Sequence, residues 1–232
     1  ILNTVSGGNV AGVGVRTDSN YSDLVLALPL VGSANDVSNQ INSGSTTKTI
    51  TVTNAVANYT YSNFYGGSYY FDGNGDYLSV SSSSDFAFGT GDFTLEYFIN
   101  TTDTGYNLMH PDSGSGSGYW GHLIQSSSFN WNDAWNTTNL WNVNATPILN
   151  GEWHHCAICR ASGTTKAFFD GVAQAFTSHS NALTVTDNTD YSGVDGWEIG
   201  GNGNLSDLSG YLQDLRIYKG VAKYTENFIP AS

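Results

Sequence analysis

Short apolar segments with a period of two, separated by turns of glycine and asparagine, constrain the fold of this chain more than any other feature. In residues 93–99, for example, Phe93, Leu95, Tyr97 and Ile99 lie at alternate positions. Such alternation is typical of a strand with one buried face. Comparable segments recur about every ten residues, and none has a helical period of useful length. The pattern predicts an all-β protein, an antiparallel two-sheet jelly-roll sandwich.

Length, charge and composition narrow the class of protein and of partner further. A chain of 232 residues suits one large all-β domain. We expect residues 1–20 to form an N-terminal arm or linker and residues 21–232 to form the domain. Seven Lys and Arg against twenty Asp and Glu give a net charge of -13, which excludes nucleic acid as a partner. The longest apolar run, residues 24–31, is too short to span a bilayer, so we expect no membrane insertion.

Three blocks combine a strand with a glycine turn, and they lie at residues 71–80, 151–155 and 210–218. Their order and spacing resemble the laminin-G-like branch of the concanavalin A-like lectin and glucanase superfamily, over about residues 24–229. The resemblance extends to laminin-G-like domains found in marine bacteriophage structural proteins and bacterial surface adhesins. It implies a concanavalin A-like sandwich in which the strand of residues 212–218 lies beside the strand of residues 24–28.

The superfamily contains glucanases, whose activity depends on paired catalytic carboxylates. Retaining glycosidases need two carboxyl groups on one face, and these glucanases supply them from one strand in the pattern Glu-x-Asp-x-x-Glu. The chain has four glutamates, Glu96, Glu152, Glu198 and Glu226, and none is followed two residues later by an acid. We therefore expect a protein that is not an enzyme.

Cysteine and histidine residues cluster at 154–159 and suggest a zinc site at first reading. Cys156 and Cys159 are three residues apart in a predicted strand, so their side chains point to opposite faces. Thiols on opposite faces cannot converge on one tetrahedral ion or form a disulfide. We expect two buried thiols that behave as small apolar side chains.

Calcium is the better metal candidate. Pentraxins, which resemble this fold distantly, place calcium where two loops meet, and the resemblance implies Asp112, Asn202, Asn204 and Asp207 as ligands here. Calcium prefers carboxylate, amide and carbonyl oxygens. The alternative is that Asn and Gly in the second loop only close a tight turn. A second acidic stretch, residues 72–76, is similar to the start of an EF-hand loop, but it lacks the downstream Glu and predicts a hairpin turn instead.

The stretch of residues 130–141 is unusually rich in tryptophan and asparagine. Indole faces stack on the apolar face of a pyranose, and neighbouring amide and carboxyl groups bond its hydroxyls. This pattern predicts a glycan-binding site at Trp131, Asn132, Asp133, Trp135 and Trp141. The alternative is that Trp131 and Trp135 belong to the core or to a contact with a neighbouring subunit.

Together these observations predict an extracellular, non-catalytic glycan-binding or adhesion module of a virion or cell-surface protein, with surface polysaccharide as its partner. The competing hypothesis is a structural component of a virion or filament, such as a capsid decoration, tail or fibre subunit. It would assemble with copies of itself or other virion proteins through its sandwich and its N-terminal arm, because a mobile segment can order by pairing with an exposed strand.

Overall fold

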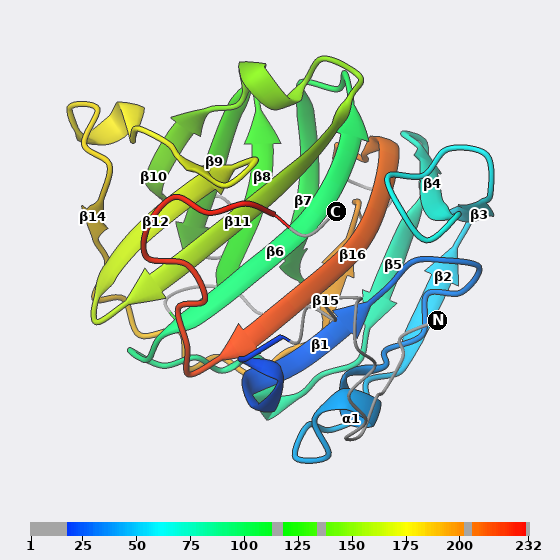
Figure 1. Ribbon diagram of the computed structural model, residues 1–232, viewed down its shortest axis with the longest axis horizontal. Coiled ribbons are helices and arrows are strands. Elements are labelled where there is room, and N and C mark those ends of the chain that lie inside the picture. The colour runs from blue at the N-terminus through cyan, green and yellow to red at the C-terminus, as the bar shows by residue number, and fades with distance from the viewer. Residues whose placement is uncertain (1–17, 113–117, 134–137, 202–205, 231–232) are drawn as a thin grey trace, which may run out of the picture.

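The computed structural model describes residues 18–112, 118–133, 138–201 and 206–230, which form two antiparallel sheets packed as a sandwich (Figure 1). The nine-stranded sheet has the order β13-β12-β11-β6-β16-β4-β3, with β1 beside β16 and β14 beside β12. Its strands are β1 (Leu24–Leu28), β3 (Val56–Asn58), β4 (Ser68–Asp72), β6 (Phe93–Thr101), β11 (Trp153–Ala161), β12 (Thr164–Phe169), β13 (Val172–Ala173), β14 (Val185–Thr186) and β16 (Ser209–Lys219).

The seven-stranded sheet has the order β10-β9-β8-β7-β15-β5-β2. Its strands are β2 (Ile50–Thr53), β5 (Tyr77–Val80), β7 (Gly105–Pro111), β8 (Trp120–Gln125), β9 (Ser128–Asp133), β10 (Thr138–Asn144) and β15 (Trp197–Ile199). The helices in the described ranges are short: α1 (Ser38–Ile41) and the 3-10 turns η1 (Tyr21–Asp23), η2 (Ser84–Phe86), η3 (Thr146–Ile148) and η4 (Thr177–His179). None of these helices has the length and apolarity needed to span a lipid bilayer.

The core fills the space between the two sheets. Phe93, Leu95, Tyr97 and Ile99 of β6 are all buried there, which confirms the strand face predicted from alternation. The seven-stranded sheet contributes a stack of indole rings, in which Trp120 lies between Trp131 and Trp197. The predicted sandwich is therefore present, and β1 pairs with β16 as the resemblance implied.

The turn at residues 72–76 differs from the prediction. It was expected to close a hairpin, but β4 belongs to the nine-stranded sheet and β5 to the seven-stranded sheet, so the turn crosses from one layer to the other. Asp76 Oδ2 accepts a hydrogen bond from the amide of Asp72 at 2.7 Å, and Gly75 donates to Asp207 Oδ2 at 2.8 Å. The local sequence predicted the turn correctly. It could not distinguish a hairpin from a connection between the two sheets.

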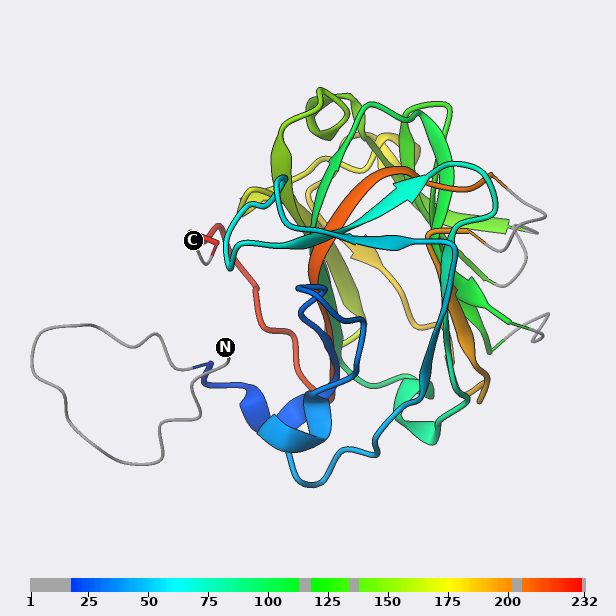
Figure 2. The same cartoon turned by 90° about the vertical axis from the view of Figure 1, so that its right-hand side faces the viewer.

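The C-terminal segment, residues 221–230, lies on the outer face of the nine-stranded sheet. Figures 1 and 2 show it crossing that sheet on the side away from the seven-stranded sheet. Phe228 packs near Phe168, and Tyr224 stacks on Phe228 with ring centroids 3.5 Å apart. Glu96 of β6 holds the same segment, because its carboxylate accepts hydrogen bonds from Lys223 at 2.6 Å and Tyr224 at 2.8 Å.

Candidate functional site

The candidate site lies where β16 changes partners along one edge. One half of this edge pairs with β4 and the other half with β1. Between the two halves the register with β6 shifts, and Asp214 has a φ of 51°. Such a β-bulge inserts an extra residue into a strand and redirects its side chain. Leu212 and Leu215 both stay in the core, so Gln213 and Asp214 are left on the outer face.

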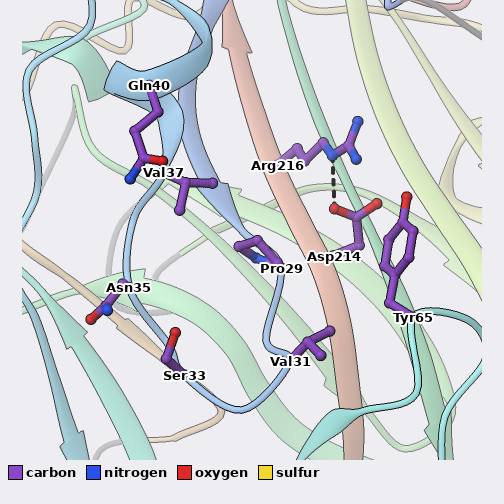
Figure 3. A pocket seen from close by; sticks show the side chains of 9 residues that line it. All are labelled: Pro29, Val31, Ser33, Asn35, Val37, Gln40, Tyr65, Asp214 and Arg216. Carbon is purple, nitrogen blue, oxygen red and sulfur yellow. Dashed lines mark hydrogen bonds and ion pairs between the residues drawn. The ribbon is translucent and has the colours of Figure 1, made fainter. Parts of the chain in front are cut away.

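A cavity of about 270 Å³ opens at this break. Figure 3 shows Tyr65 on one side, Gln40 on the opposite side and Pro29 between them, with the Arg216 and Asp214 side chains next to Tyr65. The lining combines apolar, amide, hydroxyl and charged groups from three parts of the chain: Pro29, Val31, Ser33, Asn35, Val37, Gln40, Tyr65, Asp214 and Arg216. Such a mixture suits a ligand that carries both apolar faces and hydroxyl groups.

An ion pair forms the polar wall of this cavity. Arg216 Nε donates to Asp214 Oδ1 at 2.8 Å. Burial raises the pKa of Asp214, and the charge of Arg216 opposes that rise. Burial would lower the pKa of Arg216, but Asp214, Tyr218 and Glu96 together outweigh it and raise the pKa well above its usual value. Partial burial and then Asp214 raise the pKa of the Tyr65 phenol, so it keeps its proton and can donate to a ligand.

A buried glutamine fixes the loop that carries Tyr65. Gln213 is fully buried, and its Oε1 accepts hydrogen bonds from the amides of Asn63 and Phe64, each at 3.2 Å. Its Nε2 donates to the carbonyl oxygens of Phe64 and Gly67. Both ends of this amide are thereby satisfied by loop backbone. The position of Tyr65 is set before any ligand arrives, which lowers the entropy cost of binding.

The structure corrects the prediction that two of the tryptophans bind glycan. Trp131 is 0% exposed and Trp141 is 1% exposed, and their rings lie parallel with centroids 6.1 Å apart. Trp131 Nε1 donates to the hydroxyl of Tyr191 at 2.9 Å. The prediction that these two rings stack on a sugar is wrong in this structure, because the alternation in β9 turns Trp131 inward. The alternative, that Trp131 is a core residue, is correct.

The other members of that predicted site fall elsewhere. Trp135 lies outside the described residues, and Asp133 is described only through its backbone at the end of β9. Asn132 faces outward and lines a second cavity, of about 280 Å³, together with Gln125. Two rings line this cavity, Tyr106 at 1% exposed and His110 at 6%, so its described residues offer no exposed ring face for stacking.

The calcium prediction required two loops to meet, and the described residues do not bring them together. Asp112 follows β7, and its amide bonds to the carbonyl of Gly196. Asp207 follows Ser206, whose carbonyl bonds to the amide of Asn107. These attachment points are five residues apart along β7, roughly 16 Å in a strand. The backbone of Asp112 is therefore tied near one end of β7 and that of Asp207 near the other, and the other two predicted ligands, Asn202 and Asn204, lie outside the described residues.

The cysteine and histidine cluster behaves as its strand spacing predicts. Cys156 lies in the main core and Cys159 in a small cluster on the opposite face. Burial raises the pKa of both thiols, that of Cys159 to about 12, so neither is available as a thiolate. His154 bonds to Asp170 at 2.7 Å. In the described part of the chain, no group of three or more His, Cys, Asp or Glu side chains is placed to hold a metal ion.

Sequence reasoning missed the cavity at β16, although one signal for it was present. Strand alternation from Leu212 predicts the next inward residue at position 214, but the next apolar residue is Leu215. This slip by one residue marks the bulge that places Asp214 and Arg216 at the cavity. No local pattern could have placed Tyr65 beside them, because it approaches from about 150 residues away in the sequence.

Solved structures of botulinum neurotoxin binding domains have a similar fold. The serotype D binding domain has a TM-score of 0.63 at 14% identity, over 88% of this chain and 50% of that chain. The DC binding domain in complex with rat synaptotagmin II has a TM-score of 0.64 at 12% identity, over 88% and 50%. A type C structure, from a toxin whose cell entry depends on interaction with two ganglioside molecules, has a TM-score of 0.62 at 11% identity, over 88% and 50%. The chain spans about half the length of these structures, and the likeness shows the fold.

Sequence comparison identifies the family. Curated proteins gave no match. A family model described as the concanavalin A-like lectin/glucanases superfamily matches residues 71–226, which is more than half of the chain. The matched range begins within β4 and ends in the C-terminal segment, so it includes most strands of both sheets. The chain therefore belongs to the concanavalin A-like lectin/glucanases superfamily.

Proposed function

We propose that this protein is a non-catalytic carbohydrate-binding module of a virion or cell-surface protein, and that the cavity at the β16 bulge holds its sugar ligand. The observation that carries the proposal is the exposed ring of Tyr65 beside the Arg216 and Asp214 pair. An aromatic face packs on the apolar face of a sugar ring, while charged and amide groups bond its hydroxyls.

The remaining lining residues fit the same ligand. Ser33, Asn35 and Gln40 are exposed and offer both donors and acceptors. Pro29 and Val37 supply apolar contact between them. A cavity of about 270 Å³ is near the lower end of the usual size of small-molecule pockets, which suits one or two sugar units.

The chemistry of the carboxylates supports binding without catalysis. Glycoside hydrolysis needs a pair of carboxyl groups placed across one bond. Asp214 is the carboxylate at the cavity, and it is occupied by its ion pair with Arg216. The Glu96 carboxylate accepts hydrogen bonds from Lys223 and Tyr224 of the C-terminal segment.

The surface setting is supported by composition and by the fold. Only 12% of the residues are charged, so neutral hydrogen-bonding groups make up most of the surface. The charges that are present give the chain a net charge of -13. Such a surface suits hydrated polysaccharide. The type C neurotoxin with a similar fold depends on ganglioside molecules for cell entry, and this makes glycan recognition at a cell surface a reasonable function for the sandwich.

Replacing Tyr65 with alanine should weaken glycan binding by roughly five- to tenfold, or about 1 to 1.4 kcal/mol, since one stacked ring contact is lost. The ligand would first be identified by screening the protein on an array of purified neutral and acidic glycans. Affinity would then be measured by titration calorimetry for the wild type and each variant.

Tyr21→Ala is the matched control, because Tyr21 and Tyr65 are both 55% exposed and only Tyr65 lines the cavity. The control should bind like the wild type. If Tyr65→Ala also binds like the wild type, the sugar is held elsewhere. If the wild type binds no glycan and instead assembles into ordered oligomers, the structural-component hypothesis takes the place of this one.

A further inference from the structure

Aromatic side chains form a row across the outer face of the nine-stranded sheet, beside the cavity. Trp153 on β11 is opposite Asn100 on β6, Asn100 is opposite Tyr211 on β16, and Tyr211 is opposite Tyr70 on β4. Residues directly opposite in antiparallel strands point to the same face. Because neighbouring strands are about 4.8 Å apart, the row spans roughly 14 Å.

The rings of this row are close together and reach solvent. Tyr70 and Tyr211 have ring centroids 4.9 Å apart, and Trp153 lies 6.4 Å from Tyr211. Tyr61, from the loop between β3 and β4, stacks on Tyr211 at 4.9 Å and is itself 47% exposed. Trp153, Tyr70 and Tyr211 are each partly exposed. We call these four residues, Trp153, Tyr211, Tyr70 and Tyr61, the aromatic row.

The aromatic row is held in place by the same loop that forms the cavity. The amide of Tyr61 donates to Asn58 Oδ1 at 2.7 Å, and its carbonyl accepts a hydrogen bond from the Ser68 hydroxyl. Gln213 binds the following residues of the loop, up to Gly67. Tyr61 and Tyr65 are thus four residues apart in one anchored loop, the first over the row and the second in the cavity.

The charge of this surface selects the ligand. All members of the aromatic row are neutral, and the nearest exposed charges in sequence are the carboxylates of Asp72 and Glu152. Asp72 lies two residues after Tyr70 in β4 and so points to the same face. With a net charge of -13 on the whole chain, an anionic polymer would be repelled. A neutral polyol meets no such repulsion and can use both the ring faces and the phenol hydroxyls.

We propose that the aromatic row binds an extended, neutral polysaccharide chain, whose sugar units continue from the cavity at Tyr65 over Tyr61 and Tyr211. This inference rests on the proposed carbohydrate-binding function and adds a second subsite to it. The cavity binds one or two units, and the row adds contacts that only a longer chain can reach.

Affinity electrophoresis in native gels tests this inference. The gels contain one soluble neutral polymer each, namely barley β-glucan, xyloglucan or galactomannan, with alginate as the anionic comparison. We expect at least one neutral gel to retard the wild type and alginate not to retard it. Tyr61→Ala should weaken polymer binding at least fivefold, and Tyr61→Phe, which keeps the ring, should restore most of it. Tyr21→Ala should migrate like the wild type.

Chain length separates the aromatic row from the cavity. With oligosaccharides cut from the polymer that binds, Tyr61→Ala should bind the disaccharide like the wild type and lose affinity as the chain grows. Tyr65→Ala should lose affinity at every length. The inference is overturned, with the proposed function intact, if Tyr61→Ala binds polymers of all lengths like the wild type.

Two further outcomes would also overturn it. If no polysaccharide or array glycan binds the wild type, the proposed function fails and the inference fails with it. If Tyr61→Ala leaves sugar binding unchanged but abolishes self-association in light scattering, the aromatic row is a contact between copies of the chain.

Discussion

Replacing Trp131 with alanine should destabilise the protein by about 3 to 5 kcal/mol, the usual cost of removing a large aromatic side chain from a core. Trp131 is 0% exposed, and its ring stacks on Trp120 at 4.8 Å and on Phe93 at 5.3 Å. The substitution would also leave the hydroxyl of Tyr191 without the indole donor at 2.9 Å. Urea unfolding followed by circular dichroism measures the change.

Trp153→Ala is the matched control for this prediction, because the same side chain is removed from a partly exposed position on the outer face. Its loss of stability should be clearly smaller. A cost below about 1 kcal/mol for Trp131→Ala would contradict the burial of the indole stack. It would also restore the earlier hypothesis that this ring is available to a sugar.

The substitution Glu96→Gln should cost about 3 to 5 kcal/mol at pH 7, since removing one partner of a buried ion pair leaves the other charge unpaired. Glu96 is 5% exposed and lies 2.6 Å from Lys223 Nζ and 3.4 Å from His155 Nε2. Unfolding in urea at pH 7 gives the size of the loss. Limited proteolysis should also cut the C-terminal segment faster, because Lys223 and Tyr224 lose the carboxylate that holds them.

The stability of the wild type should fall in acid for the same reason. Burial on its own would raise the pKa of Glu96, but the hydrogen bond from His155 and the charge of Lys223 outweigh it and hold the pKa far below its ordinary value of 4.5. A carboxyl with a lowered folded pKa contributes stability above 4.5, and this is lost as the pH falls below 4.5 toward the folded value. Glu96→Gln should flatten that part of the pH profile.

Glu226→Gln is the control for both measurements, because Glu226 is exposed on the same C-terminal segment. It should leave the urea midpoint and the pH profile close to those of the wild type. If Glu96→Gln were as stable as this control at pH 7, and equally sensitive to acid, Glu96 would not hold the segment.

Much of the architecture follows from local sequence. The alternation in residues 93–99 predicted a core strand face, and the resemblance to laminin-G-like domains predicted the pairing of β1 with β16. The period-two alternation of the sequence could not decide which face of β9 points toward the core. Residues 129, 131 and 133 share one face and residues 130 and 132 the other, and both faces carry side chains that can bind sugar. Packing against the second sheet decided it, with Trp131 inward and Asn132 outward.

The candidate site was harder to predict because long-range pairing creates it. Tyr65, Gln40 and Arg216 come from three distant parts of the sequence and meet only because β16 exchanges β4 for β1 at its bulge. The two carboxylates of the calcium prediction are separated for a related reason. β7 and β15 are antiparallel, so the residue after β7 and the loop after β15 lie at opposite ends of the pair.

A crystal structure of the wild type with an oligosaccharide of a polymer that it binds tests the central claim most directly. The account predicts a sugar ring against the face of Tyr65, hydrogen bonds from its hydroxyls to the Arg216 and Asp214 pair, and further units extending over Tyr61. A sugar bound instead in the cavity of the seven-stranded sheet, beside Asn132 and Gln125, with the Tyr65 cavity free of ligand, would contradict it.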